Sequence, residues 1–285
     1  MSRRLLYSLC LSLLFISCYE DDDEVAMKIV VEGWIESGGT PMVMLTNSIP
    51  VTTYEKTGEN AEFVLPWGKV TVSDGTQTVI LTGDYDERYF PSYVYTTSKM
   101  RGVPGRTYHL TVEYGDYVVT AQTTIPVPDS LEALTVTPCA DVDSMYQITA
   151  YYEDAPETED YYLFLTRIFN REKRFYPSFL GVIDDSRLAL HNKQIVQPGI
   201  HLSTTENHKY HPYFHESDSV QIKFAKIDET SYHIHKAYSE MVSLSSNPIF
   251  SSNLFMPTNI EGGLGFWCGY AVTKYNVVIA DSLEN

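Results

Sequence analysis

The sequence predicts a mainly β protein, in which an N-terminal immunoglobulin-like β-sandwich is followed by a second β-rich domain with one or two helices. Three observations lead to this prediction. Short segments of alternating apolar and polar residues, rich in β-branched and aromatic side chains, recur from residue 27 onward. Gly, Asn, Asp and Pro separate these segments at a spacing typical of a sandwich. One stretch, near residues 229–244, instead has apolar residues at helical spacing.

The first 17 residues have the order of a secretory signal, with Arg3 and Arg4 followed by an apolar run from Leu5 to Ile16 and a small residue. The run is shorter than the roughly 20 apolar residues of a membrane span. The junction Phe-Ile-Ser-Cys resembles the lipobox of bacterial lipoproteins, in which the cysteine thiol is acylated and the signal is removed in front of it. We therefore expect Cys18 to be the lipidated first residue of the mature chain, with plain secretion or a partly buried Cys18 as the alternative.

Residues 18–25 are expected to form an acidic tether, because the like charges of Asp21 to Glu24 repel each other and extend the chain. This segment also resembles the acidic export signal of surface lipoproteins of Bacteroidota, which implies the exterior face of the outer membrane. Removal of residues 1–17 leaves 18 basic and 37 acidic residues, a net charge of −19. A field of this sign repels phosphate backbones and argues against nucleic acid as a partner.

Residues 26–126 are predicted to form the β-sandwich domain. Strands or hairpins are expected at Met27–Glu36, Pro41–Thr46, Gly68–Gly83 and Arg106–Ile125. The sequences Ser-Asp-Gly-Thr and Tyr-Gly-Asp-Tyr are predicted as hairpin turns, because Gly and Asp tolerate the backbone angles of tight reversals. Two prolines between Ile125 and Ser130 favour a linker, so we place the domain boundary there.

Residues 127–285 are predicted to form the second domain. Strands are expected at residues 131–138, 145–154, 160–169, 219–228 and 266–279, with a long loop region at 170–217. In the helix near 229–244, Asp228 is the expected N-cap, and Tyr232, His235 and Tyr238 share one face. That face should cover a sheet. A tight turn is expected at 259–265, before the final strand.

Several motifs together resemble one family over nearly the whole mature chain. They are IVVEGWIESGGTPMVMLTNSIPV, GKVTVSDG, VPGRTYHLTVEY and SSNPIFSSNLFMPTNIEGGLGFWCGYAV. Their order is similar to that of the domain-of-unknown-function 4249 family. The resemblance implies an exported lipoprotein of Bacteroidota that is commonly encoded beside a TonB-dependent outer-membrane receptor. It implies no established activity and no catalytic residue.

Cysteine and histidine side chains offer the remaining candidates for chemistry. Cys139 and Cys268 stay in the mature chain, and a disulfide between them and two separately buried thiols are both open. His208, His211 and His215 are the candidate ligands of a transition metal. Because Pro212 breaks any helix that would align these imidazoles, we favour an exposed polar loop. No cofactor other than the lipid on Cys18 is expected.

Ser130, Ser144 and Ser219 each lie in an Asp-Ser-aliphatic sequence, as does Ser282. The pattern resembles the acceptor of O-glycosylation in exported Bacteroidota proteins.

The function expected from these observations is non-enzymatic. The chain has no GxSxG sequence and no P-loop. We expect a surface-anchored accessory or ligand-capture partner of a TonB-dependent receptor in nutrient uptake, with residues 170–217 and 259–265 as contact regions. The alternatives are a surface hydrolase of glycan or peptide and a purely structural or adhesion module.

Overall fold

The computed structural model describes residues 27–48, 63–140, 142–153, 158–185, 191–199, 211–245 and 256–279. The strands of its large sheet are β1 Ile29–Glu36, β2 Met42–Asn47, β3 Lys69–Ser73, β4 Thr78–Tyr85, β5 Tyr93–Thr96, β6 Thr107–Tyr114, β7 Tyr117–Thr124, β10 Tyr161–Ile168, β11 Tyr176–Asp184, β14 Ser219–Ile227 and β15 Leu264–Val278. The smaller sheet contains β8 Ala133–Pro138, β9 Met145–Glu153, β12 His191–Val196 and β13 Phe214–His215, and the helix α3 is Glu229–Ser245. The mainly β prediction is confirmed, whereas the immunoglobulin-like strand order stays a prediction.

The large sheet has 11 strands in the order β11-β10-β14-β15-β1-β2-β5-β4-β3-β6-β7. In its first part, β1 to β7, every second side chain of β1 is buried, as the alternating sequence predicts. These side chains pack with those of β3 and β6 into one hydrophobic core. The two expected hairpin turns are confirmed, between β3 and β4 and between β6 and β7.

The first part is a curled sheet that closes on itself. The backbone N–H of Thr120 in β7 donates to the carbonyl of Glu261 at 3.1 Å, and Glu261 N–H donates back at 2.8 Å. Glu261 lies just before β15, which pairs with β1 at the other side of the sheet. These hydrogen bonds join β7 to the segment in front of β15, and β15 in turn pairs with β1. The first part therefore has a barrel-like shape.

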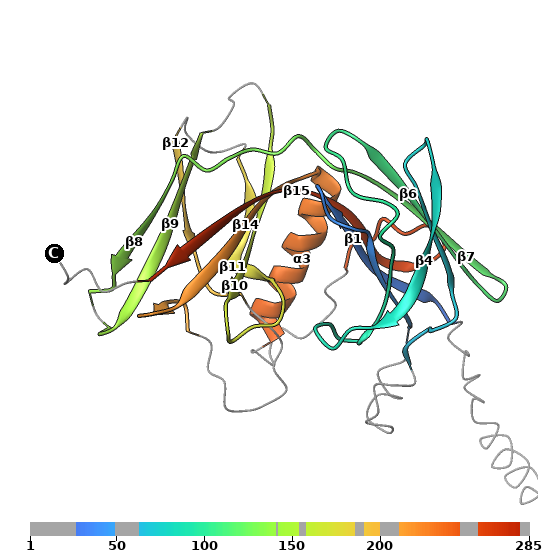
Figure 1. Ribbon diagram of the computed structural model, residues 1–285, viewed down its shortest axis with the longest axis horizontal. Coiled ribbons are helices and arrows are strands. Elements are labelled where there is room, and N and C mark those ends of the chain that lie inside the picture. Colours follow the sequence, from blue (N-terminus) through green and yellow to red (C-terminus); the bar gives the residue numbers. More distant parts are fainter. Residues whose placement is uncertain are drawn as a thin grey trace, which may run out of the picture.

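Strand β15 belongs to both parts of the molecule. It pairs in parallel with β1 and antiparallel with β14, and Figure 1 shows it running across the middle of the molecule between the two parts. Trp267 enters the core of the first part, whereas Cys268 and Tyr270 face the opposite side of the sheet. Gly265 has a φ of +96°, and a Cβ there would lie 1.9 Å from the carbonyl oxygen of Val31, so a side chain would disrupt the start of this pairing. The boundary predicted at residue 127 stays a prediction.

In the second part, the β10–β14–β15 region packs against the smaller sheet. Tyr152 of β9 contacts Tyr162 and Phe224 with ring centroids 5.4 and 5.6 Å apart. The stretch 170–217, expected as a loop region, contains β11, β12 and β13, because apolar side chains such as Phe214 complete this core.

Helix α3 covers the other face of the same strands (Figure 1). The carboxylate of Asp228 accepts a 2.7 Å hydrogen bond from Ser231 N–H, which confirms the expected N-cap. Tyr232 and His235, which belong to α3, are buried on the side of the helix that faces the sheet. Among the described residues, no helix combines the length and apolar character needed to cross a membrane.

Candidate functional site

Partly or fully buried polar side chains gather beneath α3, where the two parts of the molecule meet. We call Glu32, His235, Tyr238, Cys268 and Tyr270 the junction cluster. Glu32 lies on the face of β1 that points away from the barrel core, because its neighbours Val31 and Gly33 occupy the core-facing positions. The other members come from α3 and from the matching face of β15.

Burial favours the neutral forms of the groups in the junction cluster. His235 Nε2 lies 2.8 Å from Tyr270 Oη, and burial lowers the pKa of His235 to about 4. Burial also raises the pKa of Tyr270 well above its ordinary value, and the nearby Cys268, Glu36 and Glu32 add to this shift. A neutral imidazole facing a protonated phenol is a stable hydrogen-bonded pair inside a protein.

Burial also shifts the pKa values of Cys268 and Glu32 toward the neutral form. Burial raises the pKa of Cys268 to about 12, so its thiol stays protonated and is a poor nucleophile. Burial likewise raises the pKa of Glu32, and the positive charge of Arg174 opposes that shift. The cluster can donate and accept hydrogen bonds, and it contains no activated nucleophile.

A set of aromatic and charged side chains joins the two parts beside the junction cluster. Trp34 of β1 and Tyr89, which follows β4, have ring centroids 5.7 Å apart. The guanidinium of Arg174 lies 5.7 Å from the Tyr89 ring centroid and 4.9 Å from that of Tyr176. Lys223 Nζ lies 2.5 Å from Glu36 Oε1 in a largely buried ion pair. These contacts hold β1 of the first part against β11 and β14 of the second.

An open hollow lies along the other side of α3. It has a volume of about 510 Å³, and its lining includes Thr230, His233, Lys236, Glu240, Pro257 and Thr258. The volume is within the range of small-ligand sites. Its lining also includes the apolar side chains of Ile234 and Ala237, and it combines them with a cation, a carboxylate and an imidazole, which suits an extended peptide segment or another partly apolar ligand.

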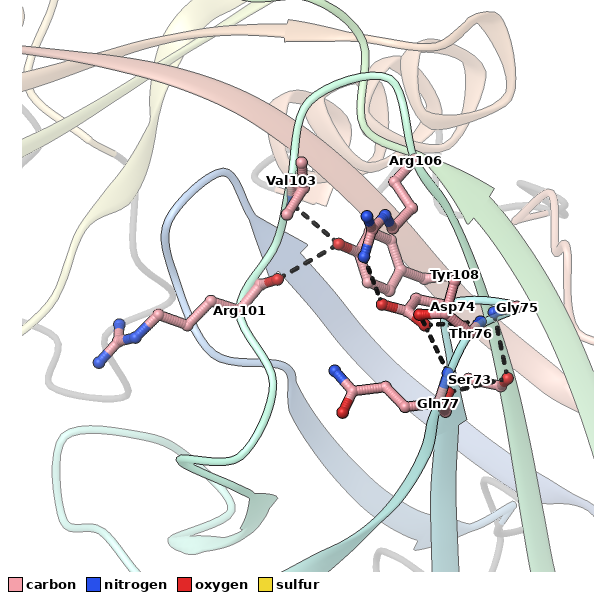
Figure 2. A network of polar contacts seen from close by, with 9 residues as sticks. All are labelled: Ser73, Asp74, Gly75, Thr76, Gln77, Arg101, Val103, Arg106 and Tyr108. Carbon is pink, nitrogen blue, oxygen red and sulfur yellow. Dashed lines mark hydrogen bonds and ion pairs between the residues drawn. The ribbon is translucent and has the colours of Figure 1, made fainter.

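A second polar network lies at the turn between β3 and β4. Figure 2 shows the carboxylate of Asp74 surrounded by donors. Its Oδ1 accepts from Thr76 N–H at 2.9 Å, Thr76 Oγ1 at 2.7 Å and Gln77 N–H at 2.9 Å, and its Oδ2 accepts from Arg106 Nη1 at 2.6 Å. Both carboxylate oxygens are therefore committed to internal contacts. The network ties this turn to β6 and leaves no site for a reacting group.

Comparison with known protein families identifies the chain. A family model described as Domain of unknown function (DUF4249) matches residues 18–276. The chain belongs to the DUF4249 family. The matched region includes both parts of the molecule, the junction cluster and the hollow, and it begins at Cys18, the residue predicted to carry the lipid. No curated protein matches the sequence.

The predicted metal ligands of this DUF4249 protein lie only partly within the described residues, so the metal site stays a prediction. His208 lies outside them, and the side chains of His211 and His215 are exposed. Among the residues that the structure describes, no group of three His, Cys, Asp or Glu side chains is placed to hold a metal.

Cys139 and Cys268 are not joined by a disulfide in the structure, and only Cys268 is buried, whereas Cys139 is partly exposed. Cys268 is buried beneath α3 in the middle of the molecule. Cys139 directly follows β8 in the smaller sheet, and its backbone N–H donates to Met145 O at 2.8 Å. The two thiols therefore belong to different packing regions.

The predicted modification sites of the DUF4249 chain lie in different surroundings. Ser130 and Ser144 are exposed, whereas Ser219 is partly buried at the start of β14. Asp129, which precedes Ser130, accepts hydrogen bonds from Tyr162 Oη and Lys226 Nζ, both at 2.9 Å. Cys18 and Ser282 lie outside the described residues.

The sequence reasoning missed Glu32, Trp34 and Arg174. A local signal exists for the first two, because they share one face of an alternating strand whose other face is apolar. Arg174 has no such signal, since its position against Tyr89 depends on contacts between residues far apart in the chain.

Proposed function

We propose that this protein is a surface-anchored outer-membrane lipoprotein that acts as a non-enzymatic accessory or ligand-capture partner of a TonB-dependent receptor in nutrient uptake. The observation that carries this proposal is Cys18 within its lipobox-like junction, at which the family match begins. An acidic segment follows it, and only eight residues, 19–26, separate it from the described fold. The usual gene neighbourhood implied by the family supports the choice of partner.

The junction supports binding over catalysis. Its imidazole, thiol and phenol are kept neutral by burial, and the carboxylate of Asp74 is saturated with donors. The shared strand β15 and the Lys223–Glu36 pair hold the two parts together. A pre-organised body loses little conformational entropy when it binds a partner. In this proposal the hollow beside α3 contacts the receptor or its ligand.

The test is cross-linking in intact cells. The protein carries a C-terminal tag, and co-purifying proteins are identified by mass spectrometry, with Cys18→Ala as the unlipidated control. We expect a TonB-dependent barrel in near-equal amount with the parent and a loss of that barrel with Cys18→Ala. Recovery of no barrel from a lipidated, correctly exported protein would refute the proposal, and hydrolase assays would then follow.

A photo-reactive amino acid tests the contact surface. It is placed at Glu240 in the hollow and, as a matched control, at Lys193, an exposed position in β12 of the smaller sheet. We expect a cross-link to the barrel from position 240 and none from position 193. Equal labelling at both positions would show that the hollow is not the contact surface.

A further inference from the structure

Three large apolar side chains are exposed at one end of the barrel-like first part. Trp67 is 85% exposed, Val118 is 58% exposed and Tyr117 is 43% exposed. We call these three residues the aromatic end. Trp67 is notable because tryptophan has the largest side chain and is highly buried on average in folded proteins. An exposed group of this kind commonly marks a contact surface.

Strand register places the three residues at the same end of the sheet. Trp67 lies two residues before β3, whose first residue Lys69 pairs with Glu113 of β6. One residue further along β6, Tyr114 pairs with Tyr117 across the β6–β7 turn. The turn that carries Tyr117 and the segment that carries Trp67 therefore flank the same ladder.

The described chain begins at this same end. A Cβ built on Gly263 would lie 2.7 Å from the carbonyl oxygen of Ile29 and 2.9 Å from Val119, so the start of β1 lies close to the start of β7. Figure 1 shows the β6–β7 turn at one extreme of the molecule and β8 and β9 at the other. The eight residues between Cys18 and Met27 span at most about 28 Å when fully extended. A lipid on Cys18 would thus keep the aromatic end close to the bilayer.

We propose that the aromatic end docks on the surface of the lipid bilayer that holds the Cys18 anchor. This inference rests on the proposed anchoring at Cys18. Trp and Tyr rings favour the membrane–water interface, where their apolar body is buried and their polar atom stays hydrated. The adjacent charges are mixed, since Lys69 pairs with Glu113 at 2.7 Å and Asp116 lies in the turn. Docking therefore depends on insertion of apolar side chains and only weakly on salt. The smaller sheet, at the opposite extreme, then faces away from the lipid.

The first test measures whether Trp67 enters lipid. The chain from residue 18 with Cys18→Ala is held on phosphatidylcholine vesicles by an N-terminal polyhistidine tag and a nickel-chelating lipid. Brominated acyl chains quench tryptophan fluorescence only at contact. Trp267 is buried and Trp34 is partly buried, so Trp67 is the exposed reporter. We expect bromolipid quenching that Trp67→Phe removes. The proposal would be overturned if bromolipid does not quench the fluorescence of Trp67 while acrylamide in the aqueous phase still quenches it.

The second test compares substitutions at two exposed valines, in protein that is not tethered to the vesicles. Val118 is the second residue of β7, and Val127, which is 68% exposed, follows the other end of that strand. We expect the double variant Trp67→Ser, Val118→Ser to bind phosphatidylcholine vesicles about tenfold more weakly than the parent, because two apolar side chains no longer leave water. Val127→Ser should bind like the parent. Equal loss from Val127→Ser, or a steep fall in parent binding with added salt, would refute docking through the aromatic end.

Different results would refute the proposed anchoring through Cys18 and the proposed docking of the aromatic end. Bromolipid quenching together with absence of acyl label on Cys18 in cells would refute the anchor and retain the docking surface. An acylated Cys18 together with no quenching would refute the docking surface alone. Protection of Trp67 from acrylamide only in the presence of the receptor would assign the aromatic end to a protein contact and overturn the inference.

Discussion

Replacement of Asp74 by Asn tests the account of the turn between β3 and β4. Asn keeps the size of the side chain and one acceptor oxygen, so the contacts with Thr76 and Gln77 can persist. Its amide nitrogen cannot accept the 2.6 Å hydrogen bond from Arg106 Nη1. A hydrogen bond to a charged group contributes about 1.5–3 kcal/mol. Because Arg106 is partly exposed and regains water, we expect a loss near the lower end, about 2 kcal/mol at pH 7.

The pH dependence of this loss provides the sharper criterion. Burial of Asp74 by itself raises the carboxyl pKa, but the donors from Thr76, Gln77 and Arg106 outweigh it and hold the pKa below its ordinary value of 3.8. The stabilisation is therefore fully present above pH 3.8 and is lost as the pH falls through the lower folded-state pKa. The gap between parent and Asp74→Asn should shrink as the pH is lowered below that value.

Urea unfolding followed by tryptophan fluorescence, from pH 7 to pH 3, measures the gap. The matched control is Asp116→Asn, an exposed aspartate in the other hairpin turn, which should change the free energy of unfolding by less than about 0.5 kcal/mol. Two results would refute the reasoning: a gap at pH 7 no larger than that of the control, or a gap that stays constant down to pH 3.

Two further predictions concern buried groups of the junction cluster. The pKa of His235 is lowered from 6.5 to about 4 by burial, so the parent should lose up to about 3 kcal/mol of stability as the pH falls from 6.5 to 4. In urea unfolding His235→Phe should lack this loss, and identical pH slopes for the two proteins would contradict the account. The two thiols should also differ in reactivity: a maleimide should label the partly buried Cys139 in the folded protein and should label Cys268 only after unfolding, as counted by mass spectrometry. Labelling of Cys268 at the rate of an exposed thiol would show that the region beneath α3 is open.

Local patterns were sufficient where the structure depends on neighbouring residues. The alternation in β1 predicts its buried face, and Asp228 predicts the start of α3 through a contact only three residues long. The stretch 170–217 was harder to interpret, because β13 has only two residues and gains its place by pairing with β9. A segment that short has no period to recognise.

The candidate site depends even more on contacts between residues that are far apart in the chain. Trp34 and Tyr89 are 55 positions apart in the chain, and His235 and Tyr270 are 35 apart, yet each pair is in contact. Nothing in the local sequence around any of these four residues indicates its partner. The histidines that the sequence did place together, His211 and His215, are exposed and make no described metal site.

The sequence by itself determined the β-rich character, the hairpin turns, the helix cap and the family, because each depends on residue type and short spacing. Only the tertiary structure decided that β15, near the end of the chain, pairs with β1 near its beginning and thereby joins both parts of the molecule. The physical reason is that backbone hydrogen bonds between strands are the same for every residue. The partner of a strand is therefore selected by the packing of whole faces, such as Trp267 against Gly33, whereas the alternation within a strand determines only which face is buried.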